Sequence, residues 1–254
     1  MPPARLALLP LALSMGCAEG SAPVGVASAA TTVVDDVSPA PRPAPEQAPA
    51  VAPVARPAPA EAITLNQAIL DEVHAVHAEG APYVWSKGVN TDGVTQEVWW
   101  RGTLLAAPEA SGGIHCSGVT FEVYVRALAR VVGEDNGPSV EAMKALKEAW
   151  YVRDGGEQGP VGALVDAGLG DRVVGLAALQ PGDLVQFWRN NGKGHSVVFM
   201  GPTRNSDGSV RGLVYWSAQG TSGGIGMRRT SPGPDINQIN PNRLYGVRAR
   251  WPAR

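Results

Sequence analysis

Hydrophobic side chains recur at intervals of three and four residues in three stretches of the chain, as they do on the buried face of a helix. The first stretch contains Leu65, Ile69, Val73 and Val76. Thr64 and Gln67 form a capping box at its start, and Gly80 is its expected end. His74 and His77 lie on this predicted helix, where we expect solvated side chains because no further metal ligands accompany them.

The second stretch runs from Cys116 to Val132, and Gly133 is its expected end. Hydrophobic residues lie around so much of the helix circumference that we expect a central, buried helix. The third predicted helix begins after Ser139, which is a favourable N-cap residue. Its inward-facing residues are Met143, Leu146 and Trp150.

Beyond a glycine-rich segment at residues 154–160, apolar and polar residues alternate as they do in strands. Strands are predicted over residues 183–188, 196–200, 213–218 and 245–251, with turns at 190–192 and 205–208. Helices first and strands second predict an α+β fold class, with N-terminal helices packed on an antiparallel β-sheet. Residues 63–254 are therefore expected to form one globular domain, which is long enough to bury a core.

The first 62 residues differ in composition from the rest of the chain. Residues 1–17 are predicted to be a signal peptide, because Arg5 precedes an apolar stretch that is too short to span a membrane. Cys17 follows a small residue, as at a lipoprotein processing site, so either Cys17 is lipidated or ordinary cleavage occurs after a residue such as Ala18. Residues 18–62 are predicted to be a disordered Pro/Ala-rich linker, since twelve of the 22 prolines lie before residue 60.

Charge and cysteine content exclude several classes of function. A formal net charge of −2 excludes a broad cationic face, so no nucleic-acid partner is expected. No apolar run reaches the ~18–20 residues of a membrane span. Two cysteines exclude a disulfide framework and a four-thiolate metal site, and we expect neither a metal nor an organic cofactor.

Cys116 is the residue with the most distinctive chemistry. It opens the buried helix, where unpaired amides favour a thiolate, although a small buried side chain is the alternative interpretation. A thiolate nucleophile needs a base, and His195 is the expected one, with His115 as a rival beside the cysteine. Gln219 is expected to orient His195 through its amide oxygen, and Ser217, which has the same parity on the strand, is the alternative.

Four short segments follow one another in a characteristic order. They are Gly80-Ala81-Pro82-Tyr83-Val84-Trp85, Cys116-Ser117-Gly118, Leu179-Gln180-Pro181-Gly182-Asp183-Leu184 and Gly194-His195-Ser196-Val197-Val198. Together they resemble the motifs of the NlpC-type cell-wall cysteine peptidases over residues 65–220. The chain departs from the family pattern at His115, where aspartate is common, and in the long segment 90–113. We expect Trp99 and Trp100 in that segment either to line a substrate groove or to belong to the core.

The resemblance implies a papain-like fold with Cys116 as nucleophile, His195 as base and Gln219 as a polar third member. It also implies that Tyr83 lies near the oxyanion site with the Cys116 amide. Ser117 and Trp85 are the further candidates for oxyanion or substrate binding.

The implied activity is hydrolysis of amide bonds in peptidoglycan stem peptides. The protein is expected to be an exported monomer, either held in the cell envelope through a lipid on Cys17 or secreted. Two alternatives remain open. The domain is a tethered wall-binding module that binds muropeptides without cleaving them, or it transfers the acyl group to an amine instead of water.

Overall fold

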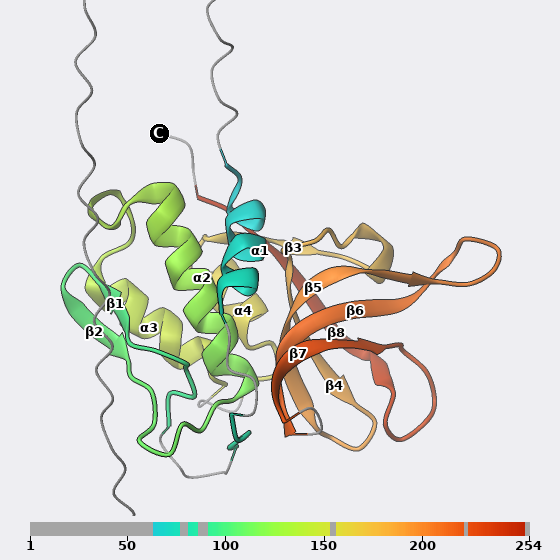
Figure 1. The fold of residues 1–254 in the computed structure, drawn as a ribbon. Helices are drawn as coiled ribbons and strands as arrows, with labels where there is room; N and C mark the ends of the chain where they lie inside the picture. Colours follow the sequence, from blue (N-terminus) through green and yellow to red (C-terminus); the bar gives the residue numbers. More distant parts are fainter. Residues whose placement is uncertain (1–62, 77–80, 86–90, 153–155, 221–222, 252–254) are drawn as a thin grey trace, which may run out of the picture. The chain divides into compact units, whose positions relative to one another are not determined.

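The structure, a computed structural model, describes residues 63–76, 81–85, 91–152, 156–220 and 223–251. Helices and an antiparallel sheet make up these residues, so the predicted α+β class is confirmed (Figure 1). The predicted signal peptide and linker lie outside the described residues, as do Cys17, His77 and Gly80. None of the helices in the described ranges has both the length and the hydrophobicity of a membrane-spanning segment.

Local capping signals fix the bounds of most helices. The helices of the described ranges are α1 (Leu65–Ala75), α2 (Cys116–Val132), α3 (Val140–Trp150) and α4 (Pro160–Asp166), with 3-10 turns η1 (Glu134–Asn136) and η2 (Leu176–Ala178). The predicted bounds of α2 are confirmed, and Ser139 caps α3 as predicted. Thr64 caps α1, but this helix ends at Ala75 rather than Gly80, because Val76 adopts an extended backbone conformation. The sequence pattern missed α4, which is only 7 residues long.

The main sheet contains six antiparallel strands in the order β3-β8-β4-β5-β6-β7. Their bounds are β3 (Gly170–Val173), β4 (Leu184–Arg189), β5 (Gly194–Arg204), β6 (Val210–Gln219), β7 (Gly224–Thr230) and β8 (Ile239–Ala249). A separate hairpin of β1 (Val98–Trp100) and β2 (Thr103–Ala106) lies against the helices, away from the sheet (Figure 1). The predicted strands correspond to β4, β5, β6 and β8, whereas the sequence pattern missed β1, β2, β3 and β7.

Each face of the main sheet carries its own hydrophobic core. Helices α1, α2 and α4 pack on one face, and α2 is the central helix, with 12 of its 17 residues buried (Figure 1). The prediction that this helix is central and buried is confirmed. The other face carries a smaller core of Val185, Phe187, Val197, Phe199, Leu213, Tyr215 and Ile239.

The turn before β4 is anchored by a buried carboxylate. Asp183 accepts hydrogen bonds from the side chain of Asn66 in α1 (2.8 Å) and from the backbone N–H of Gln180 (2.8 Å). Arg248 of β8 donates two further bonds to it, at 3.0 and 2.9 Å. The aspartate of the Pro-Gly-Asp motif thus joins three segments that are distant in sequence, and it is a structural residue.

Candidate active site

Cys116 is the first residue of α2, and the residue before it caps the helix. The Nδ1 atom of His115 accepts a hydrogen bond from the backbone N–H of Gly118 (3.1 Å). Its Nε2–H therefore faces the carbonyl oxygen of Thr91 at 3.3 Å. Both ring nitrogens of His115 are used in holding the start of the helix, so this histidine is a structural neighbour of Cys116 rather than its base.

The glycine of the Cys-Ser-Gly motif allows a loop to approach the start of α2. A Cβ atom on Gly118 would overlap the backbone carbonyl groups of Asp92 and Gly93. The same loop is held further along by Glu122, whose buried carboxylate accepts hydrogen bonds from the backbone N–H and the hydroxyl of Thr95, each at 2.7 Å. The first two turns of α2 therefore fix residues 92–95 beside the cysteine.

Tyr83 lies next to the sulfur of Cys116. The backbone of Val84 and Pro82 pairs with Ile114, with N–O distances of 2.9 and 3.0 Å, and this places Tyr83 at the helix start. Its hydroxyl lies 3.8 Å from the Cys116 Sγ atom and donates toward it. Burial, and secondly the nearby Cys116, raise the pKa of Tyr83 far above its ordinary value, so the phenol keeps its proton.

His195 lies in β5 beside two aromatic rings that also contact each other. Phe187 and Tyr215 each stand edge-on to the imidazole, with ring centroids 5.6 Å away. Burial lowers the pKa of His195 to about 3, with a second contribution from the positive charge of Arg189. The imidazole is therefore neutral near pH 7, and the same burial makes it a weaker base than an exposed histidine.

Gln219 contacts His195, as the sequence predicted. A hydrogen bond between the two side chains partly opposes the fall in the pKa of His195. The Gln219 Oε1 atom also accepts a hydrogen bond from the hydroxyl of Tyr215 (3.0 Å). Sequence reasoning missed Tyr215, although the same parity argument that singled out Gln219 and Ser217 includes it.

Two serines join the strand of His195 to the helix of Cys116. The hydroxyl oxygens of Ser117 and Ser196 are 3.3 Å apart, and Ser196 donates to the Gln186 Oε1 atom at 2.6 Å. Because Ser117 follows Cys116 and Ser196 follows His195, this contact brings the start of α2 to the start of β5. Ser217 donates to the carbonyl oxygen of Ser196 at 2.7 Å, so its hydroxyl is engaged with the backbone of β5.

The predicted tryptophans separate into exposed and buried side chains. Trp85 is 51% exposed and stands edge-on to His115 at 4.9 Å, so its free surface lies beside the helix start. Trp100 is fully buried and donates to the carbonyl oxygen of Pro138. Trp99 is 47% exposed. The core interpretation therefore holds for Trp100, whereas Trp99 faces solvent.

Arg189, at the end of β4, adds a positive charge to the site. Its guanidinium lies 5.0 Å from the Phe187 ring centroid, and its Nε–H donates to the carbonyl oxygen of Asn237 (3.0 Å). Burial raises the pKa of Tyr215, and the positive charge of Arg189, followed by its hydrogen bond to the Tyr215 hydroxyl, partly opposes this rise. No carboxylate of the described residues pairs with Arg189.

Within the ranges that the structure describes, no group of three or more His, Cys, Asp or Glu side chains is arranged to hold a metal ion. The groups gathered at the site are a thiol, a neutral imidazole, two phenols, an amide and the guanidinium of Arg189. No family model matches this chain, and neither a curated protein nor a solved structure matches it.

Proposed function

We propose that the chain is an exported thiol hydrolase of papain-like, NlpC-type architecture that cleaves amide bonds in peptidoglycan stem peptides. The observation that carries the proposal is the convergence at the start of α2. Tyr83 approaches the Cys116 sulfur there, and the Ser117–Ser196 contact brings in the strand that carries His195. The four sequence motifs, in the family's order, give the substrate class. The predicted export signal supports an exported protein, which is either anchored through a lipid on Cys17 or secreted.

In the first half-reaction, neutral His195 accepts the thiol proton of Cys116 while the sulfur attacks the carbonyl carbon of the amide. The first N–H groups of a helix have no intrahelical acceptor, and since His115 already accepts from Gly118, those of Cys116 and Ser117 stabilise the developing oxyanion. The Tyr83 hydroxyl is a further donor close to the sulfur. Protonated His195 then donates its proton to the leaving amine, and the C–N bond breaks to leave a thioester on Cys116.

In the second half-reaction, His195 accepts a proton from water as the water oxygen attacks the thioester carbonyl. The C–S bond breaks, a carboxylic acid leaves, and the proton returns to the sulfur. Gln219 holds the imidazole in one orientation through both steps, because it is hydrogen-bonded to that ring. No step requires a metal or an organic cofactor.

The test uses the full chain and its two cysteines, Cys17 and Cys116. Purified muropeptides are incubated with the wild type, Cys116→Ala and Cys17→Ala, and product masses are read by mass spectrometry. We expect a mass increase of one water across the cleaved bond for the wild type and Cys17→Ala, and no product for Cys116→Ala at an unchanged thermal transition. Full activity in Cys116→Ala would falsify the proposal.

One observation favours a second function, the binding of muropeptides without cleavage. Cys116 and His195 are only 6% and 5% exposed, which leaves little of the thiol and imidazole open to a substrate. Rapid alkylation of Cys116 near neutral pH supports the hydrolase, whereas a slow thiol together with saturable muropeptide binding supports the binding module. Adding an amine acceptor to the same incubation separates hydrolysis from transfer, because transfer gives a product heavier by the acceptor.

A further inference from the structure

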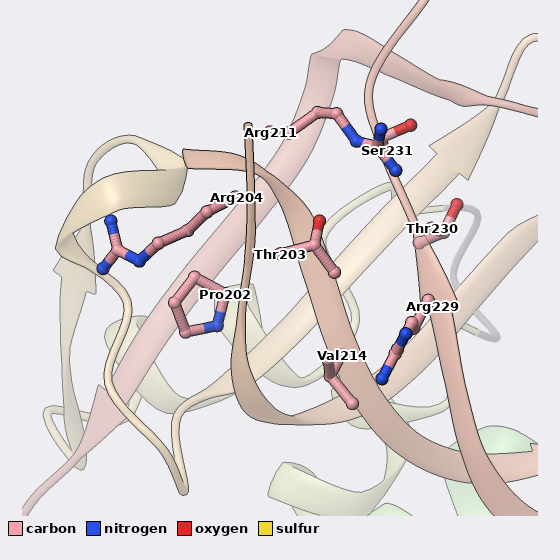
Figure 2. A pocket seen from close by; sticks show the side chains of 8 residues that line it. All are labelled: Pro202, Thr203, Arg204, Arg211, Val214, Arg229, Thr230 and Ser231. Atoms are coloured by element: carbon pink, nitrogen blue, oxygen red, sulfur yellow. The ribbon is translucent and has the colours of Figure 1, made fainter. Parts of the chain in front are cut away.

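A pocket of about 480 Å³ lies where β5 and β7 end and β6 begins. The candidate active site lies at the opposite end of these three antiparallel strands. Its lining residues are Pro202, Thr203, Arg204, Arg211, Val214, Arg229, Thr230 and Ser231 (Figure 2). His195 is the second residue of β5 and Arg204 is its last. At roughly 3.3 Å per residue, these two positions are separated by ~30 Å along the strand. The pocket is therefore a separate site.

Positive charge is concentrated around this pocket. Residues 201–231 contain four arginines and a single aspartate, a formal charge of +3 in a chain whose net charge is −2. That aspartate, Asp207, accepts hydrogen bonds from the backbone N–H and the hydroxyl of Ser209 at the hairpin turn. No carboxylate of the described residues forms an ion pair with Arg211 or Arg229. Two guanidinium groups of the pocket thus lack a negative partner within the described part of the chain.

Strand geometry builds the pocket wall. β5 shifts register at Phe199/Gly201 and again at Thr203/Arg204, and such bulges bend a strand and redirect its side chains. A Cβ atom on Gly212 would lie 2.9 Å from the Thr203 Oγ1 atom and 2.9 Å from the Ser231 Cβ atom. A glycine at this position lets the two hydroxyl-bearing residues approach each other. Figure 2 shows the guanidinium of Arg211 beside Ser231 and that of Arg229 beside Val214.

We propose that this pocket binds a phosphate ester through Arg211, Arg229 and the surrounding hydroxyl groups. All the charged side chains of the lining are cationic, and its other polar side chains are the hydroxyls of Thr203, Thr230 and Ser231. A carboxylate is satisfied by one bidentate guanidinium, whereas a phosphate has more acceptor oxygens and up to two charges, which match several donors. The lining contains no aromatic ring on which a nucleobase would stack, so the ligand is a phosphate on an aliphatic or sugar alcohol.

The test measures binding to the full chain by calorimetry with glycerol 3-phosphate, inorganic phosphate and acetate as probes. The variants are Arg211→Gln and Arg229→Gln. Arg228→Gln is the matched control, because this substitution changes the net charge by the same amount. Arg228 is next to Arg229 in β7 but does not line the pocket. We expect saturable binding of glycerol 3-phosphate that is about tenfold weaker in each pocket variant and changes less than about twofold in Arg228→Gln.

Flotation with vesicles of phosphatidylglycerol, against vesicles of phosphatidylcholine, separates a lipid headgroup from a soluble ester. If the chain binds phosphatidylglycerol vesicles but neither phosphatidylcholine vesicles nor a soluble phosphate, a lipid is the source of the phosphate. The proposal is then supported if Arg211→Gln and Arg229→Gln bind these vesicles more weakly than Arg228→Gln does. The proposal is overturned if neither a phosphate probe nor the phosphatidylglycerol vesicles bind, if acetate binds as tightly as phosphate, or if Arg228→Gln weakens binding as much as the pocket variants do. Muropeptide cleavage is expected to be unchanged in the pocket variants, so this outcome is independent of the proposed hydrolase activity.

Discussion

Ser117 and Ser196 meet with their hydroxyl oxygens 3.3 Å apart, and each immediately follows a residue of the proposed catalytic pair. This contact is buried, since the two serines are 3% and 1% exposed. Ser196 also donates a hydrogen bond to the side chain of Gln186 in β4. The helix that carries the sulfur and the strand that carries the imidazole are therefore held together by hydrogen bonds as well as by hydrophobic packing.

Substitution Ser196→Ala tests this connection. It leaves the Gln186 Oε1 atom without its 2.6 Å donor and removes the partner of Ser117. We expect a loss of ~1–3 kcal/mol in the free energy of unfolding, which chemical denaturation measures. We also expect a lower kcat/KM on muropeptides, because the helix and the strand lose their mutual position. Ser206→Ala, at an exposed turn, is the control and should change neither quantity.

The low pKa of His195 predicts how stability depends on pH. The folded-state pKa is about 3, below the ordinary value of 6.5, because the ring is buried. As the pH falls below 6.5, the unfolded chain takes up this proton and the folded protein does not, so stability decreases. Between pH 6.5 and pH 5, above most carboxylate titration, we expect a loss of about 2 kcal/mol.

Denaturation at a series of pH values checks this slope. His195→Gln is expected to flatten it, since the titrating group is removed. His74→Gln, which replaces an exposed histidine, should leave the slope as it is in the wild type. Equal slopes in the wild type and His195→Gln would show that His195 is not the group responsible.

Replacing each of two buried tyrosines by phenylalanine is expected to change a different property, activity for Tyr215 and stability for Tyr124. Tyr215→Phe removes the donor to Gln219 and should lower kcat/KM, because the glutamine that orients His195 is held less well. Tyr124 in α2 is fully buried, and its hydroxyl has no hydrogen-bond partner among the described residues. Tyr124→Phe should therefore raise the free energy of unfolding by about 1 kcal/mol and leave kcat/KM unchanged. A loss of activity in Tyr124→Phe equal to that in Tyr215→Phe would contradict a specific role for Tyr215.

Arg189 is expected to favour substrates with a carboxylate near the scissile amide. No described carboxylate pairs with its guanidinium, which contacts Tyr215 beside His195. Arg189→Gln should raise KM about tenfold for a muropeptide with free carboxylates and less for its amidated form, with a smaller change in kcat. Lys193→Gln removes an exposed cation from the adjacent turn and should have no such effect. An equal rise in KM for both substrates would exclude charge recognition by Arg189.

The parts of the fold that the sequence predicted are those with local signals. The hydrophobic pattern and Gly133 predicted the bounds of α2, and Ser139 predicted the start of α3, whereas the capping role of His115 was not predicted. β7 was missed because its sequence, Gly224 to Thr230, has two glycines and two exposed arginines, and it becomes a strand by pairing with β6. α4 was missed because it has 7 residues and begins at a proline next to glycines, which read as a loop.

The residues of the candidate site also fall into those with a sequence signal and those without one. Cys116, His195, Tyr83 and Gln219 could be named from motifs and strand parity, and the structure gives Tyr83 and Gln219 the contacts expected of them. Arg189 could not be named, because its effect depends on a long side chain reaching across Phe187 to a hydroxyl on another strand. The serine contact could not be named either, because it depends on how the helix docks on the sheet.

The position of β8 has a consequence for the order in which the protein forms. This strand is the last in sequence of those described, yet it lies inside the sheet, between β3 and β4. Ribosomes deliver a chain from its N-terminus, so β4 has one open edge, and Asp183 has no Arg248, until residues 239–249 have been synthesised. Folding of this unit is therefore expected to be completed late in synthesis, after residues 239–249 have been added and β8 can fill the gap between β3 and β4.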